Sequence, residues 1–124
     1  MSDFKVLYVD DSHTMRRILK NSLNKVGFND LIEAENGREA LEKLLDVDVD
    51  LIVTDWNMPE MNGEKMVVEL RGNPKYKDIP ILMVTTRGMK EDVITAVKIG
   101  VNGYMVKPFT PEILKKKIND ILSK

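Results

Sequence analysis

Short apolar runs alternate with amphipathic stretches along this chain. The runs cover residues 6–9, 31–34, 51–54, 81–84 and 104–106, a length that is typical of strands in a buried sheet. Between the runs, apolar residues recur every three or four positions, which is the spacing of a helix with one buried face. The pattern predicts five strand-helix units. Repeated units of this kind indicate an α/β fold, in which a parallel sheet has helices on both faces and right-handed crossovers.

Turn and capping residues separate the predicted elements. Gly27 and Gly100 end two of the helices, Asn36-Gly37 begins another, and Thr110-Pro111 is typical of a helix N-cap followed by proline. Polar residues 16, 17, 20 and 25 are expected on the outer face of the first helix. The residues expected to be buried on the five helices are Met15, Ile18, Leu19, Leu23 and Val26, then Ala40, Leu41, Leu44 and Leu45, then Met66, Val67 and Leu70, then Val93, Ala96 and Val97, and finally Leu114, Ile118, Ile121 and Leu122.

Length and composition limit the classes of protein that fit. The 124 residues, 43% of them hydrophobic, suit one domain over residues 1–124 with no attached effector domain. Lys and Arg number 19 against 20 Asp and Glu, so the net charge of −1 offers no general attraction for nucleic acid. The chain has no cysteine, no signal-peptide pattern behind Met1 and no apolar run of the roughly 18 residues that a membrane span needs. We expect a monomeric cytoplasmic protein without a nucleic-acid or membrane partner.

Reactive polar residues follow four of the five apolar runs. These residues are Asp10-Asp11, Asp55, Thr85 and Lys107. In a parallel sheet the carboxyl ends of the strands share one edge, where open α/β folds bind their ligands. Two like charges about 4 Å apart repel by roughly 4 kcal/mol at an effective dielectric near 20, so three clustered carboxylates need cations beside them. Lys107 and a divalent ion would supply the positive charge, and oxygen-only ligands suit Mg²⁺.

Each of these residues also has an ordinary interpretation when taken alone. Asp11 or Ser12 could cap the first helix, Thr85 could simply end a strand, and Lys107 could lie on the surface. Their coincidence at four strand ends favours chemistry instead. A carboxylate such as Asp55 can attack phosphorus to form an acyl phosphate when cations neutralise the phosphoryl oxygens. Thr85 and Lys107 would then each contact one of those oxygens.

The whole chain resembles the response-regulator receiver domains, and most closely their stand-alone chemotaxis members. The segments that carry the resemblance are 9–12, 14–17, 54–59, 61–63, 83–85, 103–104 and 107–110. The resemblance implies a flavodoxin-like, doubly wound sheet of five parallel strands in the order 2-1-3-4-5 with five helices. It also implies a cis Lys107-Pro108 bond. The implied phosphoacceptor is Asp55, with Mg²⁺ held by Asp10, Asp11, Asp55 and the backbone carbonyl of Asn57.

The resemblance further implies a switch and an output face. Thr85 and Tyr104 would change position together on phosphorylation, and Lys90, Tyr104 and Lys117 match the family's docking surface. Three positions vary in the family or depart from its pattern: Asn57, Thr86 in place of a small residue, and Arg87 in place of a frequent acid. We hypothesise that these three residues tune the lifetime of the acyl phosphate, with Arg87 acting near the phosphoryl group.

The predicted function is a phosphoacceptor switch rather than an enzyme acting on another substrate. The implied partners are a histidine kinase as phosphoryl donor, the flagellar motor switch as target, and a phosphatase as a further candidate. One alternative is a phosphorelay shuttle or a regulator of a non-flagellar partner. A phosphatase with an Asp nucleophile is more distant, since such enzymes commonly carry a second Asp two residues on, where this chain has Asn57. A flavin carrier is disfavoured because Asp10-Asp11 would repel a cofactor phosphate.

Overall fold

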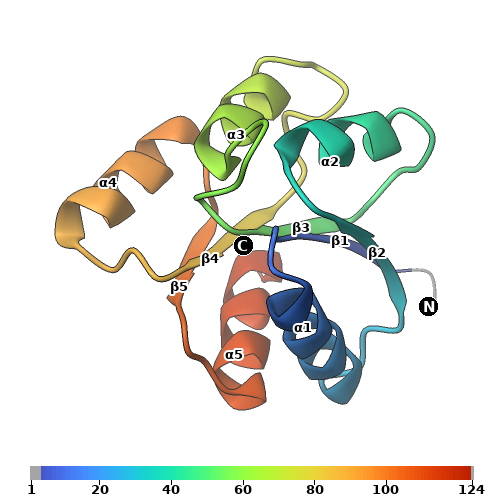
Figure 1. Cartoon of the computed structure of the whole chain (residues 1–124), viewed down its shortest axis with the longest axis vertical. Helices are drawn as coiled ribbons and strands as arrows, with labels where there is room; N and C mark the ends of the chain where they lie inside the picture. Colours follow the sequence, from blue (N-terminus) through green and yellow to red (C-terminus); the bar gives the residue numbers. More distant parts are fainter. Residues whose placement is uncertain (1–3, 124) are drawn as a thin grey trace.

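The computed structural model describes residues 4–123, so the two ends of the predicted 1–124 domain lie outside it. Figure 1 shows one sheet with α2, α3 and α4 on one face and α1 and α5 on the other. The strands are all parallel, and their order β2-β1-β3-β4-β5 confirms the predicted topology. The elements are β1 (Lys5–Val9), α1 (His13–Lys25), β2 (Asp30–Ala34), α2 (Gly37–Leu44), β3 (Leu51–Thr54), α3 (Gly63–Arg71), β4 (Ile81–Thr85), α4 (Lys90–Ile99), β5 (Gly103–Val106) and α5 (Pro111–Leu122). Within the described chain, no helix combines the length and apolar character that a bilayer crossing requires.

Strand burial explains why the apolar runs are nearly continuous. Every residue of β3 and β4 is buried, and so are four of the five residues of β1, because helices cover both faces of these central strands. The edge strands β2 and β5 are only partly buried. The two faces of the sheet thus support two separate apolar clusters, one beneath α2, α3 and α4 and one beneath α1 and α5.

Strand register brings the predicted functional residues to one edge. Val9 pairs with Thr54, so the acids that follow β1 and β3 lie on neighbouring strand ends. Thr85 pairs with Val106, which places Lys107 directly beyond the last pair of β4 and β5. The four strand ends therefore meet as the sequence predicts.

Four helices begin with a side chain that accepts a hydrogen bond from a backbone N–H three residues later. These N-caps are Ser12, Asn36, Asn62 and Thr110, with distances of 2.9–3.2 Å. Ser12, rather than Asp11, caps α1, which leaves the Asp11 carboxylate available for another role. The predicted cap at Thr110 is confirmed.

The predicted helix stripes are wrong at several positions. Ile18, Leu45, Val97 and Leu122 are 41%, 70%, 63% and 39% exposed, because each lies at the margin or end of its helix's buried face. Arg16, expected on the polar face of α1, is only 8% exposed. It lies three and seven residues before Leu19 and Leu23, so helical geometry places all three on the inner face.

Gly63 allows the loop after β3 to fold tightly against the start of α3. Its N–H donates to the carbonyl of Trp56 at 2.8 Å. A Cβ atom at this position would lie 2.1 Å from the backbone oxygen of Asp55. The position therefore requires a residue without a side chain, because a side chain would collide with the backbone of the predicted phosphoacceptor.

We expect Gly63→Ala to lower the free energy of unfolding by more than about 3 kcal/mol, since the backbone around Asp55 would have to move. Gly72→Ala is the matched control, because the nearest atom to a Cβ there is 3.6 Å away. The control should change stability by no more than about 1 kcal/mol. Urea denaturation measures both values, and equal losses would contradict the packing argument.

Candidate functional site

Three carboxylates meet at the carboxyl edge of the sheet. Asp10, Asp11 and Asp55 each offer an oxygen atom, and these atoms lie within 4.8 Å of one another. Asp10 is buried, Asp55 is partly buried and Asp11 is exposed, so the group opens to solvent on one side. This all-oxygen donor set fits Mg²⁺, which is commonly bound by one or two carboxylates together with water. The side chains predicted as metal ligands are therefore close enough to share one ion.

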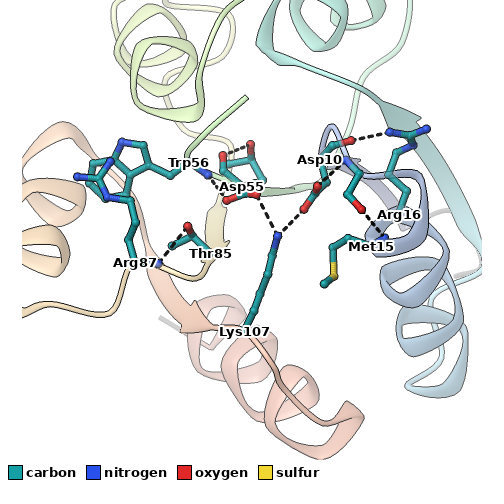
Figure 2. Close-up of polar contacts among 10 residues, drawn as sticks. Asp10, Met15, Arg16, Asp55, Trp56, Thr85, Arg87 and Lys107 are labelled. Carbon is teal, nitrogen blue, oxygen red and sulfur yellow. Dashed lines mark hydrogen bonds and ion pairs between the residues drawn. The ribbon is translucent and has the colours of Figure 1, made fainter. Parts of the chain in front are cut away.

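Lys107 lies between two of these carboxylates (Figure 2). Its Nζ atom is 2.7 Å from Oδ2 of Asp10 and 2.9 Å from Oδ2 of Asp55. The backbone N–H of Lys107 donates to the carbonyl of Thr85 at 2.9 Å, which fixes the start of the side chain against β4. The Lys107-Pro108 bond is cis, as the family resemblance implied.

Backbone N–H groups hold the second carboxylate oxygen of both Asp10 and Asp55. Oδ1 of Asp10 accepts from the N–H of Ser12 at 2.9 Å, and Oδ1 of Asp55 accepts from the N–H of Trp56 at 2.6 Å. Each carboxylate is thus held by a backbone donor on one side and by Lys107 on the other. This arrangement fixes the orientation of both groups before any ligand arrives.

The local electrostatics are a balance between burial and pairing. Burial raises the pKa of Asp10, although the hydrogen bonds from Lys107 and Ser12 act in the opposite direction. For Lys107, burial alone would lower the pKa. The hydrogen bonds to Asp10 and Asp55, together with the attraction of their charges, outweigh burial, so the pKa of Lys107 is raised and the amine stays charged at neutral pH.

Thr85 is buried at the end of β4. Its Oγ1 atom accepts a hydrogen bond from the backbone N–H of Arg87 at 3.3 Å. Since the hydroxyl is the acceptor in this contact, its own proton remains available to another oxygen. Thr85 is therefore chemically suited to the predicted phosphoryl contact.

The side chain of Arg87 stacks over the ring of Trp56, with the guanidinium carbon 3.9 Å from the ring centroid (Figure 2). Its Nη2 atom also pairs with Oδ1 of Asp92, in the first turn of α4, at 2.9 Å. Tyr104 donates its hydroxyl hydrogen bond to the carbonyl of Arg87 and approaches Trp56 edge-on. The side-chain contacts of Arg87 are therefore with Trp56 and Asp92, and its predicted effect on phosphoryl lifetime stays a prediction.

The remaining predicted residues lie outside the carboxylate cluster. Asn57 and Thr86 are exposed on the loops that follow β3 and β4. Lys90 is exposed at the start of α4 and Lys117 is half-buried on α5, while Tyr104 is half-buried on β5. Because α4 and α5 lie on opposite faces of the sheet beside β5, these three residues come from adjacent elements of one end of the molecule.

Arg16 is a site residue that the sequence interpretation missed. Its Nη1 atom donates to the backbone carbonyl of Asp10 at 2.7 Å, and its Nε atom donates to Glu33 at 3.2 Å. Arg16 therefore fixes the backbone at Asp10, where the loop after β1 begins. The available signal was its helical phase with Leu19 and Leu23, which places a long cation on the inner face beside a strand end rich in acids.

We expect Asp10→Asn to stabilise the metal-free protein at neutral pH by about 1 kcal/mol, because it removes a buried charge. Since the folded-state pKa of Asp10 is raised, the folded state binds more protons than the unfolded state between the two pKa values. The cost of the charge is full above the folded pKa and vanishes below the ordinary carboxyl range. The gain should therefore shrink as the pH falls toward about 4. Thermal melts at several pH values measure it, and a destabilised variant at neutral pH would contradict the burial argument.

Comparisons with known proteins agree with this geometry. Residues 6–119 match the response regulator receiver domain. A chemotaxis protein, the CheY homolog of Campylobacter jejuni, is 57% identical over 119 residues, which cover 95% of this chain and 92% of that protein. Chemotaxis protein CheY1 of Helicobacter pylori is 56% identical, covering 95% and 96% of the two chains.

Solved structures give the same assignment. Chemotaxis response regulator CheY4 of Vibrio cholerae superposes with a TM-score of 0.87 at 39% identity, covering 94% of this chain and 97% of that one. A CheX-CheY-BeF3-Mg complex from Borrelia burgdorferi has a TM-score of 0.91 at 25% identity and covers 98% and 90%. With the sheet order, the strand-end residues and a match over most of its length, this chain belongs to the response regulator receiver domain family.

Proposed function

We propose that Asp55 accepts a phosphoryl group from a histidine kinase and that the phosphorylated protein regulates the flagellar motor switch in chemotaxis. The observation that carries this proposal is the contact of one ammonium group, Lys107, with the carboxylates of both Asp10 and Asp55. A cation held between the acids is what an incoming phosphoryl group would need at this edge. The chemotaxis assignment rests on the relatives, which are chemotaxis proteins at 56–57% identity.

The proposed transfer moves a phosphoryl group from nitrogen to oxygen. A carboxylate oxygen of Asp55 attacks phosphorus and forms a P–O bond, while the P–N bond to the donor imidazole breaks and its electron pair stays on nitrogen. Lys107 would keep its charge and pair with a phosphoryl oxygen, and Thr85 would donate its hydroxyl proton in a hydrogen bond to another. Hydrolysis reverses the state when water attacks phosphorus and restores the carboxylate.

Asp10, Asp11 and Asp55 would hold Mg²⁺, together with the backbone carbonyl of Asn57. The ion, when bound, neutralises phosphoryl oxygens during transfer. The separation of these acids and the exposed side of the group support this assignment. The structure from Borrelia that contains BeF3 and Mg supports it by analogy, because its chain has the same fold.

We infer that the protein promotes only its own phosphorylation and dephosphorylation and is not an enzyme for another substrate. Its surroundings would be the cytoplasm, where the ATP that charges a histidine kinase is present. Output would use the face of α4, β5 and α5, where Lys90, Tyr104 and Lys117 lie. A phosphatase is a further candidate partner for ending the signal.

Incubation with Mg²⁺ and a small acyl phosphate should add one phosphoryl group to the intact protein. Trp56 is the residue after Asp55, and its buried ring contacts Arg87. Its fluorescence should therefore change as the phosphoryl group is added. Intact-mass spectrometry measures the modification, with Asp55→Asn and metal-free samples as controls. A mass gain that persists in both controls would contradict the proposed acceptor and its metal dependence.

We expect Arg87→Glu to shorten the lifetime of the acyl phosphate by about fivefold, or about 1 kcal/mol of barrier. The substitution removes the stack on Trp56, the residue after Asp55, and the pair with Asp92. Lys98→Glu is the matched control, since Lys98 is exposed in the last turn of α4. Dephosphorylation is followed by mass after the donor is removed, and an unchanged rate in Arg87→Glu would eliminate the role.

A further inference from the structure

A groove of about 490 Å³ lies between α2 and α3 and shares no lining residue with the carboxylate cluster or with the α4-β5-α5 face. The groove follows the line along which the two helices pack side by side (Figure 1). Neither the phosphoryl chemistry nor the proposed output face uses it. The groove therefore needs its own explanation.

Part of the groove lining is apolar. Leu45 lines it with 70% of its surface exposed, and the half-buried side chains of Leu41 and Met61 lie beside it. Val68 lines the adjoining hollow and is 52% exposed. Leu41 on α2 and Leu45, the C-cap residue of that helix, are one turn apart, which is the repeat that the apolar face of a docked helix would meet.

The rim of the groove is acidic. The lining of the groove and of its two adjoining hollows contains six glutamates, Glu35, Glu39, Glu42, Glu60, Glu64 and Glu69. Three cations oppose them among the described residues: Lys65 in the lining, Arg38, which pairs with Glu60 at 4.0 Å, and Lys43, which pairs with Glu39 at 3.5 Å, so the acids remain in excess. Since the whole chain has a net charge of only −1, this acidity is local to the α2-α3 face. A rim of this kind is complementary to a basic partner.

The groove is also joined to the loop that carries Asp55. Met61, which lines the groove, accepts a hydrogen bond at its carbonyl from the N–H of Gly37 at 2.9 Å. Glu60 at the rim has a left-handed backbone with φ of 65°, a strained conformation for this residue type. Strain of this kind persists where surrounding structure fixes it, and here it lies in the connection from β3 to α3. An occupant of the groove would contact the same loop that begins at the proposed phosphoacceptor.

We propose that the α2-α3 groove docks a basic amphipathic helix from a partner protein. Leucine-like side chains of that helix would cover Leu41, Leu45 and Met61, and its Lys or Arg side chains would face the glutamates. A second copy of this chain placed groove to groove would set the two acidic rims against each other. An anionic membrane surface would meet the same repulsion, so the charges favour a basic protein segment.

A synthetic amphipathic peptide of leucine and lysine tests the proposal on the full, unphosphorylated chain. Amide chemical shifts in ¹⁵N spectra should move on α2 and α3, and added salt should weaken the binding. Leu45→Gln should reduce affinity at least tenfold, and Glu69→Lys should reduce it too. Val97→Gln is the matched control, because Val97 is a similarly exposed apolar residue on α4.

Three results would overturn the proposal. They are shifts confined to α4, β5 and α5, equal binding of a peptide in which glutamate replaces lysine, or unchanged affinity of Leu45→Gln. The Asp55→Asn protein should bind the peptide as the wild type does, since no residue of the carboxylate cluster lines the groove. Failure of the phosphorylation assay would therefore leave this result standing, and the reverse is also true.

Discussion

The contact of Lys107 with Asp10 and Asp55 is the interaction on which the site depends. Two like charges about 4 Å apart repel by roughly 4 kcal/mol at an effective dielectric near 20, and Asp10 is also buried. The ammonium group offsets this cost at 2.7 and 2.9 Å. Even so, burial keeps the pKa of Asp10 raised, which means that the charged Asp10 carboxylate lowers stability at neutral pH while it serves the site.

The parallel sheet holds the residues of that cluster in position. Central strands buried on both faces fix the register, and the register sets Asp10 beside Asp55 and Lys107 beyond Thr85. Gly63 then lets the chain turn back against the carbonyl of Asp55, and Arg16 fixes the carbonyl of Asp10. The functional groups thus sit on loops whose positions are determined by the core.

Much of this arrangement could be predicted from the sequence, because strand ends are recognisable where an apolar run meets a reactive residue. Asp55 and Lys107 were predictable for that reason, whereas the strand order and the cis bond came from the family resemblance. The burial of Arg16 was not predicted, since it depends on acceptors contributed by β2 and by the loop after β1. The stack of Arg87 on Trp56 depends on the path of the loop after β4, which no local pattern specifies.

The same contacts indicate how chemistry at Asp55 could reach the surface. Thr85 accepts a hydrogen bond from the N–H of Arg87, and the carbonyl of Arg87 accepts one from Tyr104. If the Thr85 hydroxyl turned toward a phosphoryl oxygen, its hydrogen bond with the N–H of Arg87 would change. Arg87 in turn pairs with Asp92 on α4. A coupling free energy needs an element with two arrangements that both sites bias. The loop between β4 and α4 is the connection between the two sites, because Arg87 contacts Thr85, Trp56, Tyr104 and Asp92 at once.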